Sequence, residues 1–184
     1  MKKSLIASSC AFLVAMGVLF VGTAGADVVY NNSTNDLFVR FNPGLAEVGD
    51  EIILAGNART VVDFTFQYWG LNFGGGNEQA RLRFYANDGD SVPAGPSIFM
   101  PESLLFDSDW FDIGESTRAT LSFTDFITGA LTPLTTPVPD SFTWSVQFRG
   151  IDAGESAGLD LYSPPTIGGN YLEYWDNPGS FDWQ

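Results

Sequence analysis

Two groups of oxygen-bearing side chains in this sequence have the residue types that a calcium site requires. They are Asn87, Asp88 and Asp90 in one acidic turn, and Asp107, Asp109 and Asp112 in a second stretch. Calcium is a hard cation that prefers carboxylate and carbonyl oxygens. The second group does not follow the EF-hand loop, because Asp112 occupies the sixth position, where glycine is needed. The alternatives are an Asp-Gly hairpin turn for the first group and solvated strand-edge carboxylates for the second.

Exposed aromatic side chains are the second kind of candidate, because β-sandwich domains often stack sugar rings on them. Trp69 stands on the polar side of an alternating segment, and Tyr85 shares a face with Arg81 and Arg83. These two residues are the glycan-stacking candidates. Trp144 has the same parity as its apolar neighbours, meaning that it alternates in step with them along the strand. It is therefore expected on their face of the strand, in the core. For Trp69 and Tyr85, the alternative is ordinary packing.

Hydrolysis of a polysaccharide is the third chemistry, because a glycosidase needs only two carboxylates. One serves as general acid and the other as nucleophile or base. With 22 acidic residues in the chain, some pair at a suitable separation is expected by chance. The sequence therefore selects no catalytic residue. We expect a protein that is not an enzyme, with a small extracellular polysaccharide hydrolase as the alternative.

Several other chemistries are excluded by composition. The chain has 184 residues, no histidine, one cysteine and a formal charge of −14. Without imidazole, neither a Ser-His-Asp nor a Cys-His site can form, and histidine-ligated zinc or haem is excluded as well. The strong acidity argues against nucleic acid as a partner, because phosphate recognition begins with clustered lysine and arginine. We therefore expect no cofactor other than calcium.

The first residues have the pattern of a secretory signal peptide. Lys2 and Lys3 precede an apolar run over residues 5–21, and an Ala-x-Ala site follows at Ala24 and Ala26. This pattern predicts a signal helix over residues 1–26 with cleavage after Ala26, and export to the cell surface or medium of a bacterium. A retained membrane anchor is the alternative, although the run is short for a spanning helix.

Removal of residues 1–26 changes the composition of what remains. Both lysines and the cysteine are lost, leaving six arginines against 22 acidic residues, a charge of −16. We expect residues 27–184 to form a single domain that is stabilised by its core rather than by disulfides. An excess of aspartate keeps such a domain hydrated, and salt screens its self-repulsion.

Alternation of apolar and polar residues recurs after the signal segment, whereas helical periodicity does not. The clearest runs cover residues 62–68, 81–85, 119–124 and 142–149, and shorter ones cover 28–30, 37–41, 51–54, 104–113 and 159–162. Two stretches rich in Pro, Ser, Thr and Gly, 91–103 and 128–141, are expected to be long connections. This pattern predicts an all-β fold, a two-layer antiparallel β-sandwich of jelly-roll type, with a closed barrel as the alternative.

Several of these segments resemble the ectodomains of bacterial PEP-CTERM surface proteins. They are residues 49–61 (GDEIILAGNARTV), 80–89 (ARLRFYANDG), 142–148 (FTWSVQF) and 158–165 (GLDLYSPP), together with Tyr174 and Trp175. In that family a Pro-Glu-Pro motif, a short spanning helix and a basic end follow the ectodomain, and an exosortase-type system processes them. Here the chain stops at Gln184 without them. Residues 181–184 look like the beginning of a strand, which favours a truncated chain over a secreted variant.

The resemblance implies a role in the cell envelope or extracellular matrix and carries over no catalytic residue. Together with the exported β-sandwich, it predicts a non-enzymatic protein with a glycan-binding or adhesive module. Extracellular polysaccharide is then the expected partner. A membrane is contacted only by the signal segment before cleavage, or by a C-terminal anchor that this sequence lacks.

Overall fold

The structure is a computed structural model that describes residues 26–91, 99–124, 136–179 and 183–184, with the backbone alone described at 172 and 173. The predicted signal helix and Ala24 lie outside these residues, which begin at Ala26. Within the described ranges, no helix has the length and apolarity needed to cross a membrane.

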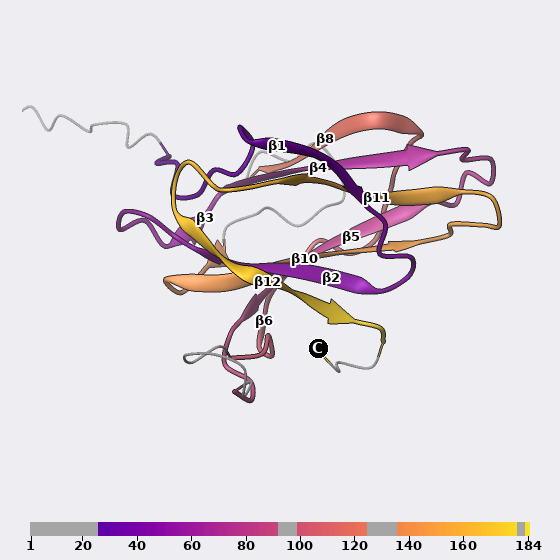
Figure 1. Cartoon of the computed structure of the whole chain (residues 1–184). Coiled ribbons are helices and arrows are strands. Elements are labelled where there is room, and N and C mark those ends of the chain that lie inside the picture. The colour runs from indigo at the N-terminus through magenta and orange to yellow at the C-terminus, as the bar shows by residue number, and fades with distance from the viewer. Residues whose placement is uncertain (1–25, 92–98, 125–135, 180–182) are drawn as a thin grey trace, which may run out of the picture.

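The described residues form antiparallel sheets packed in two layers (Figure 1). The strands are β1 (Asp36–Phe41), β2 (Glu47–Ile53), β3 (Thr60–Val61), β4 (Asp63–Leu71), β5 (Gln79–Ala86), β6 (Leu104–Asp107), β7 (Phe111–Asp112), β8 (Ser116–Thr124), β9 (Thr136–Pro137), β10 (Ser141–Arg149), β11 (Ser156–Tyr162) and β12 (Gly169–Asn177). One layer is a four-stranded sheet in the order β1-β11-β4-β8. The other is a six-stranded sheet in the order β12-β2-β10-β5-β6, with β7 also paired to β5. The predicted all-β sandwich is confirmed, and the strands of the described residues form separate sheets rather than the alternative of one closed barrel.

Alternation along the strands explains why the sheets face each other. In β4, Phe66 and Tyr68 are buried whereas Thr65 is exposed. In β10, Phe142 and Val146 are buried on the inner side, and Trp144 packs against the same core, as its parity predicts. Because successive side chains point to opposite faces of a strand, these patterns place one face of each sheet in the core.

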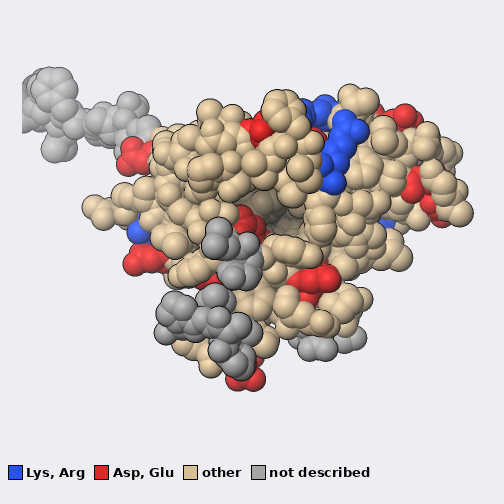
Figure 2. Space-filling model, viewed as in Figure 1, with Lys and Arg blue, Asp and Glu red and all other residues tan. Residues whose placement is uncertain are grey.

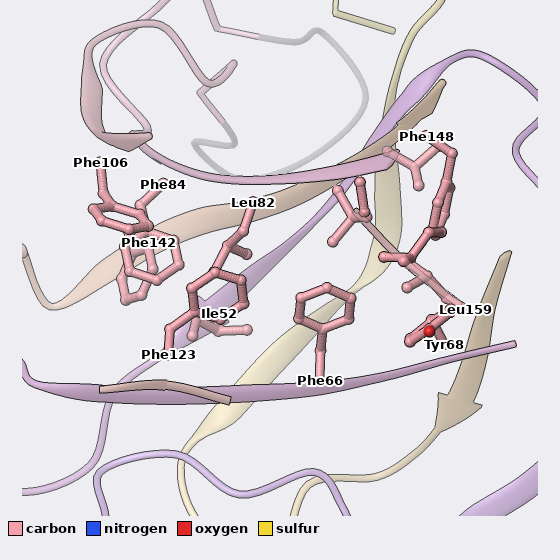
Figure 3. Close-up of a cluster of buried hydrophobic side chains, with 14 of the residues drawn as sticks. Ile52, Phe66, Tyr68, Leu82, Phe84, Phe106, Phe123, Phe142, Phe148 and Leu159 are labelled. Carbon is pink, nitrogen blue, oxygen red and sulfur yellow. The ribbon is translucent and has the colours of Figure 1, made fainter. Parts of the chain in front are cut away.

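Aromatic rings join the two layers. In Figure 3, Phe66 and Phe123 point from the four-stranded sheet towards Leu82 of the facing sheet. Phe64 of β4 meets Phe84 of β5 edge-on with ring centroids 5.0 Å apart. Each fully buried ring of this kind contributes about 1.5–3 kcal/mol relative to exposure. The sandwich is therefore held by contacts between residues far apart in the chain.

A second apolar cluster lies on the outer side of the six-stranded sheet. Tyr85, Trp175 and Trp183 are buried together there, with Met100 against them. The backbone of Gln184 exchanges two hydrogen bonds with Asp176 of β12, at 3.1 and 2.9 Å. The end of the described chain therefore pairs with an edge strand and covers part of the outer face.

The stretch 104–113, predicted as one strand, is divided into β6 and β7. Asp109 adopts φ 55° between them, a left-handed conformation that ends regular pairing. The resulting loop brings Trp110 over the outer face of the six-stranded sheet, where it contacts two arginines.

Candidate functional site

The first predicted calcium group is engaged in hydrogen bonds within the protein. Asn87 Oδ1 accepts a hydrogen bond from Thr143 Oγ1 (2.7 Å), and Asp88 Oδ1 accepts the backbone N–H of Ser103 (2.9 Å). The Ser103 N–H also holds the pKa of Asp88 below its ordinary value. The backbone carbonyl of Asp90 accepts from Met100 N–H (3.0 Å). These contacts pair residues 87–91 with residues 99–103 in antiparallel fashion, so the Asp-Gly dipeptide lies along one arm of a ladder and does not form the hairpin turn that was the alternative prediction.

The second predicted group is separated by arginine and glutamine partners. Asp107 bonds the Arg81 guanidinium through both oxygens and lies 3.3 Å from Arg83 Nε. Asp112 Oδ1 accepts from Gln79 Nε2 (2.8 Å), whereas Asp109 donates its backbone N–H to Asp107 Oδ1 (2.9 Å). Among the described residues, no three acidic side chains come together as a group able to hold a metal ion.

The charge environment of Asp107 fits this arrangement. Burial opposes ionisation of its carboxyl group, but the hydrogen bonds from Arg81 and from the Asp109 N–H outweigh that effect and lower its pKa. Asp107 is therefore an ionised partner of two arginines. A cation at this position would have to compete with both guanidinium groups for the same oxygens.

The two glycan-stacking candidates both lie on outer faces, as their parity predicts, but each ring is covered. Trp69 is 6% exposed. On one side lies Gly158, where an added Cβ would be 2.9 Å from Trp69 Cζ2. On the other side, the Arg40 guanidinium carbon is 5.6 Å from the ring centroid. A sugar ring would have to displace Arg40 to stack on Trp69.

Tyr85 is 1% exposed and lies beneath the C-terminal end of the described chain. Trp183 meets its ring edge-on at a centroid distance of 5.4 Å. The Tyr85 hydroxyl donates to Glu47 Oε1 (3.1 Å). Burial and the Glu47 charge raise the pKa of Tyr85 to about 12, so its hydroxyl stays protonated and donates. Tyr85 therefore belongs to a buried polar network rather than to an open platform.

Glu47 is the centre of that network, and the sequence analysis did not single it out. Its side chain accepts from Ser145 Oγ (2.6 Å) as well as from Tyr85, and it pairs with Arg83 Nη1 (2.6 Å). Burial opposes the charge on Arg83, but Glu47 and the other partners outweigh it and raise the pKa of Arg83. Because both oxygens of Glu47 have partners, removal of its side chain would leave Arg83 as a buried charge without its closest counter-ion.

The outer face of the four-stranded sheet is more open and differs in chemistry. We call Thr65, Gln67, Thr120, Ser122 and Tyr162 the hydroxyl-amide face, because strands β4, β8 and β11 present them on one side. Gln67 Nε2 donates to Thr120 Oγ1 (3.3 Å), and the Tyr162 hydroxyl donates to Gln67 Oε1. Thr65, Thr120 and Ser122 are exposed to solvent.

Two arginines and two aspartates border this face. We call Asp36, Arg40, Arg118 and Asp160 the acid–arginine cluster. Arg118 bonds Asp36 Oδ2 (2.7 Å) and lies 3.5 Å from Asp160 Oδ2, and Arg40 lies 3.8 Å from Asp160 Oδ1. The Asp160 side chain is 1% exposed, whereas those of Arg40 and Arg118 are 43% and 44% exposed. Figure 2 shows positive side chains gathered over this layer.

Phe38 stands out within β1, between Asp36 and Arg40. It is 89% exposed and has φ 56°, a left-handed backbone conformation that is unusual for an aromatic residue. Asp36 Oδ1 accepts the Phe38 N–H (2.7 Å) and holds the turn. That hydrogen bond, followed by Arg118, lowers the pKa of Asp36. Strain of this kind costs on the order of 1–3 kcal/mol and is concentrated at functional positions in proteins.

The neighbours of Phe38 are also apolar and exposed. Leu37 and Val39 are both open to solvent, so β1 departs from the alternation of the other strands. The pairing of β1 with β11 shifts register between Asp36 and Arg40. Three consecutive apolar residues, as at 37–39, do not fit a strand that buries only one of its faces. This run was the sequence signal that could have identified the segment.

Asp50 is an ionisable residue on the inner side of β2. Its neighbours of the same parity, Val48 and Ile52, are buried in the core. Desolvation, together with the charge of Glu51, raises the pKa of Asp50 to about 7. The Tyr30 hydroxyl is buried without a hydrogen-bond partner among the described residues, and burial and then Asp50 raise its pKa. Figure 2 shows a hollow between the two layers with acidic atoms at its wall.

Comparison of the chain with protein-family models, curated proteins and solved structures found no match. The chemistry of the faces and of the hollow is therefore the basis for a functional assignment.

Proposed function

We propose that this chain is an exported, non-enzymatic protein of the bacterial cell envelope or extracellular matrix whose β-sandwich binds glycans. The observation that carries the proposal is Phe38, 89% exposed in a strained left-handed conformation. It lies between the two β1 residues that join the acid–arginine cluster beside the hydroxyl-amide face. The site thus combines one open aromatic ring with a dense set of polar groups.

This combination matches the surface of a sugar. A pyranose ring has an apolar face of C–H groups that can pack on an aromatic ring, and a rim of hydroxyls that donate and accept hydrogen bonds. Thr120 and Ser122 lie on β8, three strands from β1 and about 14 Å away, so their exposed hydroxyls can meet the rim of another unit of an oligosaccharide whose one ring packs on Phe38. A lipid tail or an apolar protein surface would bury the guanidinium groups of Arg40 and Arg118 without replacing their water, which is costly.

The proposed location draws its support from the sequence. The basic, apolar and small-residue segments of residues 1–26 have the order of a signal peptide. The remaining domain has no cysteine or lysine, and its charge of −16 favours hydration. The resemblance to PEP-CTERM ectodomains supports a place in the envelope or matrix.

A glycan array tests the function, with Phe38→Ala as the site variant and Phe99→Ala as the control. Phe99 is also an exposed phenylalanine, at an isolated bridge with Ser91 away from β1. We expect the wild type to bind a neutral or weakly charged glycan. Loss of an anchoring aromatic weakens binding by about tenfold or more, so Phe38→Ala should lose the signal and Phe99→Ala should keep it. Equal binding by both variants would contradict the assignment of the site.

The alternative function, a small extracellular polysaccharide hydrolase, draws its support from Asp50. A carboxyl group with a pKa of about 7 is suited to act as a general acid. Glu51, the adjacent carboxylate, extends to the opposite face of the sheet because successive strand residues alternate, so it does not supply the second group. Release of reducing ends by the wild type, abolished in Asp50→Asn, would establish the hydrolase and overturn the binding proposal.

A further inference from the structure

Arg149 differs from the other arginines outside the signal segment. Each of the other five lies within ion-pair distance of an acid; they are Arg40, Arg59, Arg81, Arg83 and Arg118. Within the described ranges, Arg149 has no acidic partner, although the chain has 22 acidic residues. Its side chain is at the end of β10 and the residue is exposed to solvent.

The Arg149 guanidinium is nevertheless held in one orientation. Its central carbon lies 4.2 Å from the ring centroid of Trp110, and Arg81 lies over the same ring at 5.7 Å. Its Nε donates to Gln79 Oε1 (2.7 Å), and Gln79 in turn donates to Asp112 Oδ1 (2.8 Å). The neutral amide of Gln79 thus stands between Arg149 and Asp112.

This geometry leaves one side of the guanidinium free for a ligand. Of its five N–H donors, only the one on Nε has a partner among the described residues. The donors on Nη1 and Nη2 form the fork that binds a carboxylate through two parallel hydrogen bonds. A cation held against an aromatic ring has already lost much of its side-chain freedom, so binding costs less entropy.

We propose that Arg149, positioned by Trp110 and Gln79, binds the carboxylate of a uronic acid unit in an acidic polysaccharide. The inference rests on the proposed function for the class of partner, but the site is separate, because it lies on the outer face of the six-stranded sheet. It extends that function by giving the module a second binding face on the other layer.

Charge complementarity favours a uronate over a polyanionic protein or nucleic acid. The site offers one free positive group beside an amide and an aromatic edge, and a uronate carries one negative charge among neutral hydroxyls. Asp107 and Asp112 lie close by, in contact with Arg81 and Gln79. These carboxylates repel a ligand with dense negative charge, as does the charge of the whole domain.

The test measures binding of the full chain to three soluble polymers by titration calorimetry at about physiological salt, which screens the long-range repulsion between the acidic domain and an acidic polymer. They are polygalacturonate, its methyl ester, which has the same backbone without the charge, and poly-glutamate, which presents carboxylates on a peptide. We expect binding to polygalacturonate at this salt concentration. Equally tight binding to the methyl ester or to poly-glutamate would overturn the assignment of the ligand.

Variants then locate the site. Arg149→Gln should weaken polygalacturonate binding by about tenfold or more, because it removes a charge-assisted bidentate contact. Arg149→Lys should also lose most of the affinity, since an ammonium lacks the fork. Arg59→Gln is the matched control, an arginine that pairs with Asp140 instead, and should bind normally. Melting temperatures within a few degrees of the wild type show that each variant folds.

The outcome for Arg149 is distinguishable from that for Phe38. If Arg149→Gln binds polygalacturonate like the wild type, the inference fails, whatever Phe38→Ala does on the glycan array. If Phe38→Ala keeps its array binding while Arg149→Gln loses polygalacturonate, the uronate site stands and the four-stranded face is not the site of the proposed function. Trp110→Leu should reproduce the loss seen in Arg149→Gln, because it frees the guanidinium to rotate.

Discussion

Replacement of Asp50 by asparagine should make the stability of the protein less dependent on pH. Asp50 lies on the inner side of β2 between Val48 and Ile52, and its carboxyl group is favoured in the neutral form there. Asparagine has nearly the same shape and cannot ionise. The substitution therefore removes the cost of a charge between the layers while keeping the packing almost unchanged.

The magnitude follows from the pKa of Asp50, which burial and Glu51 raise from 3.8 to about 7. Each unit corresponds to about 1.4 kcal/mol, so the full effect is about 4 kcal/mol. Because the pKa is higher in the folded state, the folded protein binds this proton more tightly than the unfolded chain does. The cost is therefore absent below about pH 4, grows as pH rises towards 7, and is constant above it.

Urea denaturation of the wild type and of Asp50→Asn between pH 4 and pH 8 measures this effect. The buried amide of asparagine adds a penalty of about 1–3 kcal/mol that does not depend on pH. The informative quantity is thus the change in the stability difference between the two proteins. We expect the variant to gain about 3–4 kcal/mol relative to the wild type between pH 4 and pH 8.

Asp63→Asn is the control, because Asp63 is an exposed aspartate at the start of β4. Its stability difference from the wild type should stay nearly constant over the same range. A constant difference for Asp50→Asn as well, or a loss relative to the wild type as pH rises, would refute the reasoning about the Asp50 environment.

Three further predictions concern other parts of the sandwich. Glu47→Ala should lower the unfolding free energy by about 3 kcal/mol, because Asp107 would be the only acidic partner left for the buried guanidinium of Arg83 among the described residues. A loss below about 1 kcal/mol in urea denaturation would show that the network contributes little. Phe38→Gly should raise stability by about 1 kcal/mol, since glycine adopts φ 56° without strain, and a lower urea midpoint would contradict the strain. Millimolar calcium should leave the melting temperature unchanged, because Arg81 and Gln79 occupy the oxygens of Asp107 and Asp112; a rise that Asp107→Asn abolishes would establish the predicted calcium site instead.

Outside β1, alternation was sufficient to predict which face of a strand the aromatic residues occupy. Trp144 packs with the core, and Trp69 and Tyr85 lie on outer faces, as their parity indicates. Parity depends only on local backbone geometry, which is why it can be read from a few neighbouring residues. The two-layer sandwich follows from many such segments together.

What covers an outer face could not be predicted in the same way. Arg40 reaches Trp69 from β1, and Trp183 reaches Tyr85 from the end of the described chain. These contacts join residues about 30 and 100 positions apart, so they depend on strand order, which alternation does not specify. Phe38, the most exposed aromatic among the described residues, belongs to the strand with the weakest alternation.

Buried charge was the other feature that the sequence analysis missed. Asp50 occupies an apolar parity position between Val48 and Ile52, and a polar residue at such a position is a departure from the pattern. Departures of this kind are often functional or strained sites. Glu47 had no such signal, because a glutamate on an outer face is normally solvated, and its burial comes from Tyr85, Ser145 and Arg83.

The most direct test of the proposed function is an NMR titration with the glycan that binds best on the array. Binding at the proposed face predicts that the largest chemical-shift changes fall on Phe38, Arg118 and the hydroxyl-amide face, with the sugar recovered unchanged. Changes centred on Asp50 together with new reducing ends would contradict it, and would identify Asp50 on the inner side of β2 as part of a catalytic site.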